Sequence, residues 1–220
     1  MAVPMVGDPH WAPPLPAGQT FLGHADTEPG RLRIGRYHSP GLPGLVVLPD
    51  CLRAYEEASA LLTDLGHQVE DTVPPFAPDV LPFFETVWSV TAHGAPVDPA
   101  AEGELRPLTR WLRGRGAAVG GAQFMTTLAT LQMRSRQAIE ASSQFDAVLT
   151  PTLAMPPRPV GWFSDGADPA EDFARQVAFT PFTALYNVTG QPAISLPLHW
   201  SADGLPIGVM LVGRPADEAT

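Results

Sequence analysis

Hydroxyl and thiol side chains are the first candidates for chemistry in this sequence of 220 residues. A serine or cysteine nucleophile needs a neighbouring base and hydrogen-bond donors that stabilise an oxyanion. Ser142-Ser143 lies at the predicted end of a helix and Ser195 lies inside a predicted strand, whereas a GxSxG nucleophile sits on a strained turn. Cys51 lies at a predicted helix start, where a thiolate is stabilised, but a small structural hydrophobe is the preferred interpretation. These residues therefore define no reactive centre.

The charged side chains restrict the function further. All 13 basic residues are arginines, and the sequence contains no lysine. Arginine cannot serve as a general base near neutral pH because its pKa is too high. The net charge is −10, and no basic run is present. This balance argues against nucleic acid and against an anionic membrane as partners.

Metal and phosphate sites are not expected from the spacing of the residues. No two of the six histidines are three or four positions apart, and there is one cysteine, so the spacing of zinc ligands is absent. Gly120-Gly121 at a helix start could bind an anion, but a simple joint between loop and helix is the preferred interpretation. The acid pairs Glu56-Glu57, Glu70-Asp71 and Asp217-Glu218 are interpreted as solvated faces. No cofactor is expected.

The elements that must position any site alternate between strand and helix, which predicts an α/β class. Residues 32–35 and 68–73 are predicted strands, and between them a helix begins at a capping Asp50 and ends at Gly66. This order is typical of a βαβ unit. Residues 1–30, rich in proline and glycine, are expected to be irregular.

Helices are predicted next for residues 79–92 and 105–115 and from residue 120 onward. The short apolar run at residues 147–149 suits a strand buried on both faces. Helix is expected to resume at Glu171, with an interruption at Pro181. Two final strands, at residues 193–199 and 207–212, are expected to form a hairpin around Asp203-Gly204.

No boundary divides the chain, so residues 1–220 are expected to form a single domain. No apolar run is long enough to cross a membrane, and the N-terminal residues lack the features of a signal peptide. One cysteine cannot form an internal disulfide. We therefore expect a cytoplasmic protein.

The C-terminal segments NVTGQPAISLPLHW, DGLPIGVMLVGRP and DEAT closely resemble the amidase signature family. The upstream segments FDAVLTPTLAMPPRPVG, RLRIG and LLTDLGHQVE are also similar, so the resemblance covers roughly residues 30–220. It implies a mixed β-sheet covered by helices on both faces. It also implies hydrolysis of a carboxamide to an acid and an amine or ammonia, without a cofactor.

Family members use a Ser–cis-Ser–Lys triad, which lies N-terminal to the segments matched in this chain. No GGSSGG-like stretch and no lysine are present, so no catalytic residue is assigned. The resemblance implies the C-terminal portion of an amidase, inactive alone, whose partner is the N-terminal half of the same enzyme. Cutting the fold in this way is expected to expose sheet edges and to favour a homo-oligomer.

The resemblance also suggests which residues bind a small amide substrate. Asn187, Thr189 and Gln191 flank a turn that resembles the active-site wall of the family, and Phe84 and Trp88 lie in its variable region. Support of the turn and packing in the core are the alternative roles for these residues. Asn187 also begins a glycosylation sequon, which carries little weight without a secretory signal.

A second hypothesis is a non-catalytic interaction or binding module derived from the same fold. A mis-assigned start, a split gene and a true short protein are all compatible with the sequence. The sequence does not name the amide. The Trp- and Pro-rich variable region favours a free-standing amidase over a tRNA-dependent amidotransferase subunit.

Overall fold

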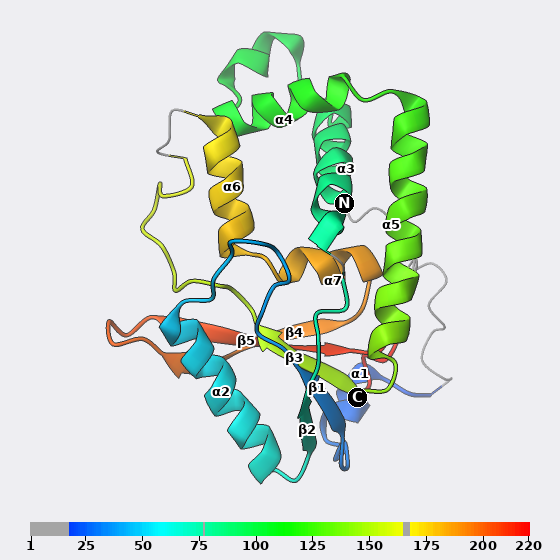
Figure 1. The fold of residues 1–220 in the computed structure, drawn as a ribbon, viewed down its shortest axis with the longest axis vertical. Helices are drawn as coiled ribbons and strands as arrows, with labels where there is room; N and C mark the ends of the chain where they lie inside the picture. Colours follow the sequence, from blue (N-terminus) through cyan, green and yellow to red (C-terminus); the bar gives the residue numbers. More distant parts are fainter. Residues whose placement is uncertain (1–17, 77, 165–167) are drawn as a thin grey trace.

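The computed structural model describes residues 18–76, 78–164 and 168–220, which form an α/β fold around one five-stranded mixed sheet (Figure 1). The strand order is β2-β1-β3-β5-β4. The parallel pairs are β1 with β2 and β1 with β3, and the antiparallel pairs are β3 with β5 and β5 with β4. The strands span Arg33–Arg36 (β1), Gln68–Asp71 (β2), Ala147–Pro151 (β3), Ala193–Trp200 (β4) and Pro206–Gly213 (β5). The predicted class and the mixed sheet are confirmed.

The predicted βαβ unit consists of β1, α2 (Pro49–Asp64) and β2. The capping role expected for Asp50 is wrong. Leu48 is the N-cap and makes no side-chain capping bond, while Pro49 takes the first helical position, which suits its fixed φ and missing N–H. Asp50 lies in the first turn, 3.7 Å from the guanidinium of Arg53. Gly66, at φ +93°, allows the chain to leave the helix.

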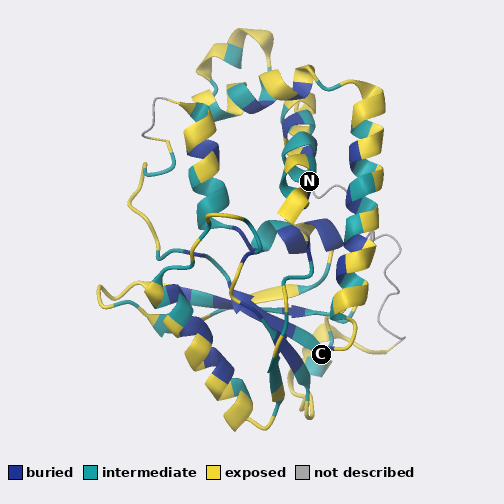
Figure 2. Ribbon diagram, viewed as in Figure 1, coloured by how far each residue is buried: buried dark blue, intermediate teal, exposed yellow. Residues whose placement is uncertain are grey.

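Helices cover both faces of the sheet, as predicted. On one face, Ala54 and Tyr55 of α2 pack against Ile34, Leu149 and Val209. On the other face lies α7 (Thr183–Thr189), which packs through Tyr186 together with the preceding Phe182. The strand β5 alternates between these two layers, as the period-two geometry of a strand requires. Figure 2 shows that burial is concentrated in the central strands of the sheet and in α7, whereas β4 is mostly exposed.

The helical segments between β2 and β3, together with α6, stand on the α7 side of the sheet (Figure 1). They are η1 (Pro78–Val80), α3 (Leu81–Gly94), η2 (Pro99–Glu104), α4 (Pro107–Ala117), α5 (Gly121–Ser142) and α6 (Pro169–Phe179). The helix α6 begins two residues before the predicted Glu171, because the Asp168 carboxylate caps it by accepting the Ala170 N–H at 2.9 Å. A third buried cluster, which includes Val87, Leu131 and Val188, joins α3, α5 and α7.

The expectation of an irregular segment over residues 1–30 is partly wrong. A short helix, α1 (Phe21–Ala25), lies within it, with the Thr20 hydroxyl accepting the Gly23 N–H at 3.0 Å. Residues 1–17, which carry the rest of that expectation, lie outside the described residues. In the part of the chain that the structure describes, no helix is both long and apolar enough to span a bilayer.

The acid pairs of α2 and β2 are not merely solvated. Arg36 on β1 binds Asp71 at 2.7 Å and Glu56 at 2.8 Å, and Glu57 lies 2.7 Å from His199 on β4. These contacts join residues that are distant in the sequence, so local patterning could not predict them.

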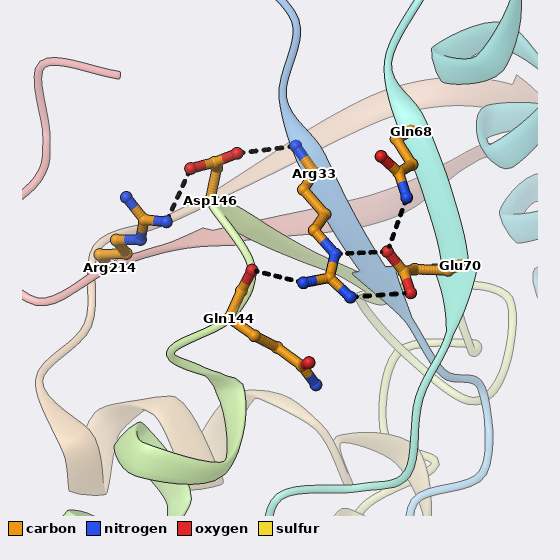
Figure 3. A network of polar contacts seen from close by, with 6 residues as sticks. All are labelled: Arg33, Gln68, Glu70, Gln144, Asp146 and Arg214. Atoms are coloured by element: carbon orange, nitrogen blue, oxygen red, sulfur yellow. Dashed lines mark hydrogen bonds and ion pairs between the residues drawn. The ribbon is translucent and has the colours of Figure 1, made fainter.

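A second network connects β1, β2 and the start of β3 (Figure 3). The guanidinium of Arg33 makes two hydrogen bonds to Glu70, and the Arg33 N–H donates to the Asp146 carboxylate at 2.7 Å. The same Asp146 pairs with Arg214, which follows β5, at 2.7 Å. Hydrogen bonding from Arg33 lowers the pKa of Glu70.

Candidate functional site

A predominantly apolar pocket lies where α3, α6 and α7 meet. Its described lining includes Phe84 and Trp88 from α3, Gln176 and Val177 from α6, and Ala184 and Leu185 from α7. No charged side chain occurs in this described lining. The cavity volume is about 40 Å³, which is room for a few water molecules or for an apolar group of similar size.

Aromatic rings fix the α3 wall of this pocket. Phe84 and Trp88 lie one helical turn apart and make an edge-to-face contact, with ring centroids 5.5 Å apart. Trp88 also packs on Phe173 of α6, which in turn contacts Trp111 of α4. Because Trp88 is 41% exposed, one side of its ring is buried and another remains open to the surroundings.

The bend between α6 and α7 forms the opposite wall. The helix α6 ends at Phe179, and Pro181 separates it from α7, since proline disfavours the helical conformation of the residue before it. Thr180 and Pro181 both line the pocket. The Thr180 hydroxyl donates to the Gln176 carbonyl at 3.1 Å, so its hydrogen-bonding capacity is partly used within the protein.

The turn residues Asn187, Thr189 and Gln191 lie at the C-terminal end of α7, beyond the aromatic pocket. Thr189 is fully buried, and its hydroxyl donates to the Tyr186 carbonyl and accepts the Gln191 N–H. The Gln191 side chain donates to the Gly213 carbonyl at 2.8 Å. Asn187 is exposed. The structure therefore brings Phe84 and Trp88 together, but it does not place them with the turn residues.

Gln191 borders a second, more open cavity of about 370 Å³ near the end of β5. Asp146 and Arg214 also line this cavity, and their ion pair stands at its edge. Each of these two side chains is thus already neutralised by the other.

A pair of buried tyrosines joins the sheet to α7. The hydroxyl groups of Tyr37 and Tyr186 are hydrogen-bonded at 2.9 Å, and both side chains are almost completely buried. Burial raises the pKa of both phenols above the ordinary value. Both therefore stay protonated near neutral pH and act as hydrogen-bonding groups rather than as bases.

The candidate nucleophiles occupy structural positions. Burial raises the pKa of the Cys51 thiol to about 11, which agrees with its interpretation as a buried hydrophobe. Ser195 lies in β4, where its hydroxyl is 2.7 Å from that of Thr152, and Ser142 donates to carbonyls of its own helix. Among the described residues, no three His, Cys, Asp or Glu side chains cluster as metal ligands would.

Comparison of the sequence with known families gives one match that covers almost the whole chain. The profile of the amidase family matches residues 2–220. This chain belongs to the amidase signature family. A protein of Mycobacterium tuberculosis described as an amidase, AmiB2, is 33% identical over 215 residues, covering 94% of this chain and 45% of that protein. A Synechocystis protein described as an amidase is 27% identical over 219 residues, covering 98% of this chain and 40% of the relative.

Two solved enzyme structures share the fold. The 6-aminohexanoate cyclic dimer hydrolase superposes with a TM-score of 0.78 at 24% identity, over 94% of this chain and 46% of the hydrolase. A bacterial aryl acylamidase of the amidase signature family superposes with a TM-score of 0.67 at 19% identity, over 96% of this chain and 45% of the acylamidase. The chain thus spans less than half the length of these relatives.

The sequence alone did not predict the pocket residues that come from α6 and α7. Phe173, Gln176, Val177 and Thr180 follow the i, i+3, i+4, i+7 spacing of one helical face, and three of them line the pocket. This spacing can be detected in the sequence, but it predicts only that another part of the protein packs on this face of α6. Which helix covers it depends on pairing with α3, which is far away in the sequence.

Proposed function

We propose that this chain is the C-terminal portion of an amide hydrolase. The complete enzyme cleaves a carboxamide to a carboxylic acid and an amine or ammonia. Its catalytic serines and lysine come from the N-terminal portion of the enzyme, which is the partner of this chain. By itself the chain is expected to be inactive.

One observation carries this proposal: the amidase profile extends over residues 2–220, yet the sequence contains no lysine. Amide hydrolysis by a serine requires a base that can take its proton near neutral pH. The 13 arginines cannot do so. In the amidase signature family this base is the lysine of the Ser–cis-Ser–Lys triad, so a base of this kind must come from outside this chain.

The contribution of this chain in the proposal is the sheet and one wall of the substrate pocket. Phe84 and Trp88 contact the substrate through the aromatic pocket. Thr189 and Gln191 act by holding the turn after α7, since both are hydrogen-bonded to the backbone, while the exposed Asn187 is free to face the substrate.

The surface around β4 is where we expect the N-terminal portion to pack. In the described part of the chain, β4 is an edge strand whose single partner is β5. Ile194, Leu198 and Trp200 on β4 are 45% to 62% exposed. An exposed apolar edge strand is a template for pairing with another strand.

The test is reconstitution of activity from two pieces. The 220-residue chain is assayed alone and after mixing with the N-terminal portion of a related amidase, such as AmiB2. The panel includes hexanamide, an aryl acylamide and the cyclic dimer of 6-aminohexanoate, since two structural neighbours are named for the last two. We expect no turnover from the chain alone and measurable amide hydrolysis from the mixture.

Turnover by the purified chain alone that a serine-directed reagent blocks would contradict the proposal. Tight association of the two pieces without any hydrolysis would favour a non-catalytic binding module. The DNA upstream of the Met1 codon gives an independent test, because an open reading frame that encodes a lysine and a Gly/Ser-rich loop would supply the missing portion in the same protein.

A further inference from the structure

We infer that the pocket between α3, α6 and α7 binds an uncharged alkyl or aryl group of the amide substrate and rejects a charged one. This inference rests on the proposed function, because it names the substrate class of the same enzyme. It concerns the group attached to the amide and not the bond that is cleaved.

The apolar composition of the pocket walls is the first observation that supports this inference. Phe84, Trp88, Val177 and Ala184 present carbon atoms, and the described lining holds no group of opposite charge for a bound ion. A charged group transferred into such a site loses its hydration without gaining an ion pair, which is strongly unfavourable. An alkyl or aryl group loses only ordered water and is favoured.

The polar atoms of the pocket carry the second step. Thr180 already donates its hydroxyl proton to the Gln176 carbonyl, which leaves the side-chain amide of Gln176 as the main polar group of the lining. One neutral amide offers a hydrogen bond but does not compensate a full charge. Pockets of this composition orient a ligand through few polar contacts and bind it through apolar area.

The shape of the pocket carries the third step. The edge-to-face contact between Phe84 and Trp88 and the further contact of Trp88 with Phe173 hold the α3 wall in one arrangement. The cavity of about 40 Å³ suits a chain of a few carbon atoms or the edge of a ring. A wall fixed in this way discriminates by size, and the apolar composition of the described lining discriminates by charge.

The test uses the 220-residue chain and three amides of matched length. Hexanamide ends in a methyl group, adipamate ends in a carboxylate and 6-aminohexanamide ends in an ammonium group. Binding is measured by calorimetry and by saturation transfer from protein to ligand. We expect hexanamide to bind at least about tenfold more tightly than either charged amide, in the range that a single apolar pocket contact supplies.

Two variants locate the binding. Phe84→Ala removes one aromatic wall and Ala184→Phe fills the space from α7, so each is expected to weaken hexanamide binding by about tenfold. Met125→Ala is the matched control, since Met125 is an apolar residue of α5 that is 64% exposed and lies outside the described lining. Circular dichroism and thermal melting establish that each variant is folded.

Equal or tighter binding of a charged amide, absence of hexanamide binding, or folded pocket variants with unchanged affinity would each overturn the inference. The proposed function fails separately. Hexanamide bound in the pocket without hydrolysis after reconstitution would refute the amidase proposal alone, whereas hydrolysis that is indifferent to Phe84→Ala would refute this inference alone.

Discussion

Tyr37, directly after β1, and Tyr186 of α7 are 149 positions apart, yet their hydroxyl groups form one buried hydrogen bond. A buried hydroxyl without a partner is costly, whereas removing both hydroxyls leaves no unsatisfied group. The net contribution of the pair to the free energy of unfolding is therefore small. Its main effect is to favour one arrangement of α7 over the sheet.

For this pair we predict strong non-additivity. Tyr37→Phe and Tyr186→Phe should each lower the free energy of unfolding by about 1–2 kcal/mol, because each strands the other hydroxyl. The double variant should lose less than the sum of the two. Urea unfolding of all four proteins measures this coupling, and strictly additive losses would show that the two hydroxyls do not depend on each other.

The interface between α3 and α4 depends on a position without a side chain. A Cβ added to Gly116 would lie 2.1 Å from the Ser89 carbonyl oxygen, so the two helices touch through their backbones there. On the same helix, a Cβ at Gly114 would meet no atom within 4 Å. The two glycines therefore form a matched pair within one element.

Gly116→Ala is predicted to lower the free energy of unfolding by about 1–3 kcal/mol, since the helices must move apart. Gly114→Ala should raise it by up to about 1 kcal/mol, because alanine favours the helix more than glycine does. Thermal melts of the two variants measure the difference. A stabilising effect at Gly116 would mean that α3 and α4 do not pack this closely.

The ion pair between Arg33 of β1 and Glu70 of β2 makes the pairing of these strands dependent on pH. Arg33 lowers the pKa of Glu70 below its ordinary value of 4.5 in the folded state. A lowered folded-state pKa stabilises the protein above the unfolded-state pKa, and this contribution is lost as the pH falls through the folded-state value.

Glu70→Gln should therefore reduce stability near neutral pH and flatten the loss of stability below about pH 4.5. The effect should be small, because the pair is partly exposed and screened by salt. Unfolding curves from pH 3 to pH 7 check the sign. A variant that loses stability in parallel with the wild type over this range would assign the acid sensitivity to other groups.

The sequence predicts elements better than it predicts their partners. The apolar run at residues 147–149 identified β3, and the Asp203-Gly204 turn located the final hairpin, because both signals are local. The ion pairs of Arg36 and the contact of Phe173 with Trp88 are not predicted, because they join residues that meet only in the folded chain. For the same reason, the sequence predicts Phe84 and Trp88 as pocket residues but does not predict the α6 and α7 residues opposite them.

The exposed edge of β4 determines how the whole molecule behaves alone. Ile194 and Trp200 are 55% and 62% exposed, and β4 is eight residues long. Edge strands associate unless charges, prolines or other elements protect them, and in β4 Pro197 and the register shift after Leu196 leave the first half of the strand, with Ile194, unprotected. We therefore predict that the 220-residue chain associates with itself through this edge.

We predict that the chain sediments as species larger than its 23.4 kDa mass and binds a hydrophobic dye. The combined variant Ile194→Lys and Trp200→Lys should shift it toward the monomer, because lysine on an edge strand opposes pairing. Leu61→Lys on α2, where Leu61 is 45% exposed, is the control. A monomeric wild-type chain with little dye binding would contradict the prediction.

The hydrogen bond from the Arg33 main-chain N–H to the Asp146 carboxylate spans 113 positions and has a consequence for folding kinetics. Joining such distant segments requires closure of a long loop before any pairing energy is gained, so β1 and β3 are expected to come together late. The helices between them make local contacts and are expected to form early. Substitutions in the α3 wall of the pocket, which lies within this excursion, are therefore expected to leave the slow step, the joining of the central strands, unchanged.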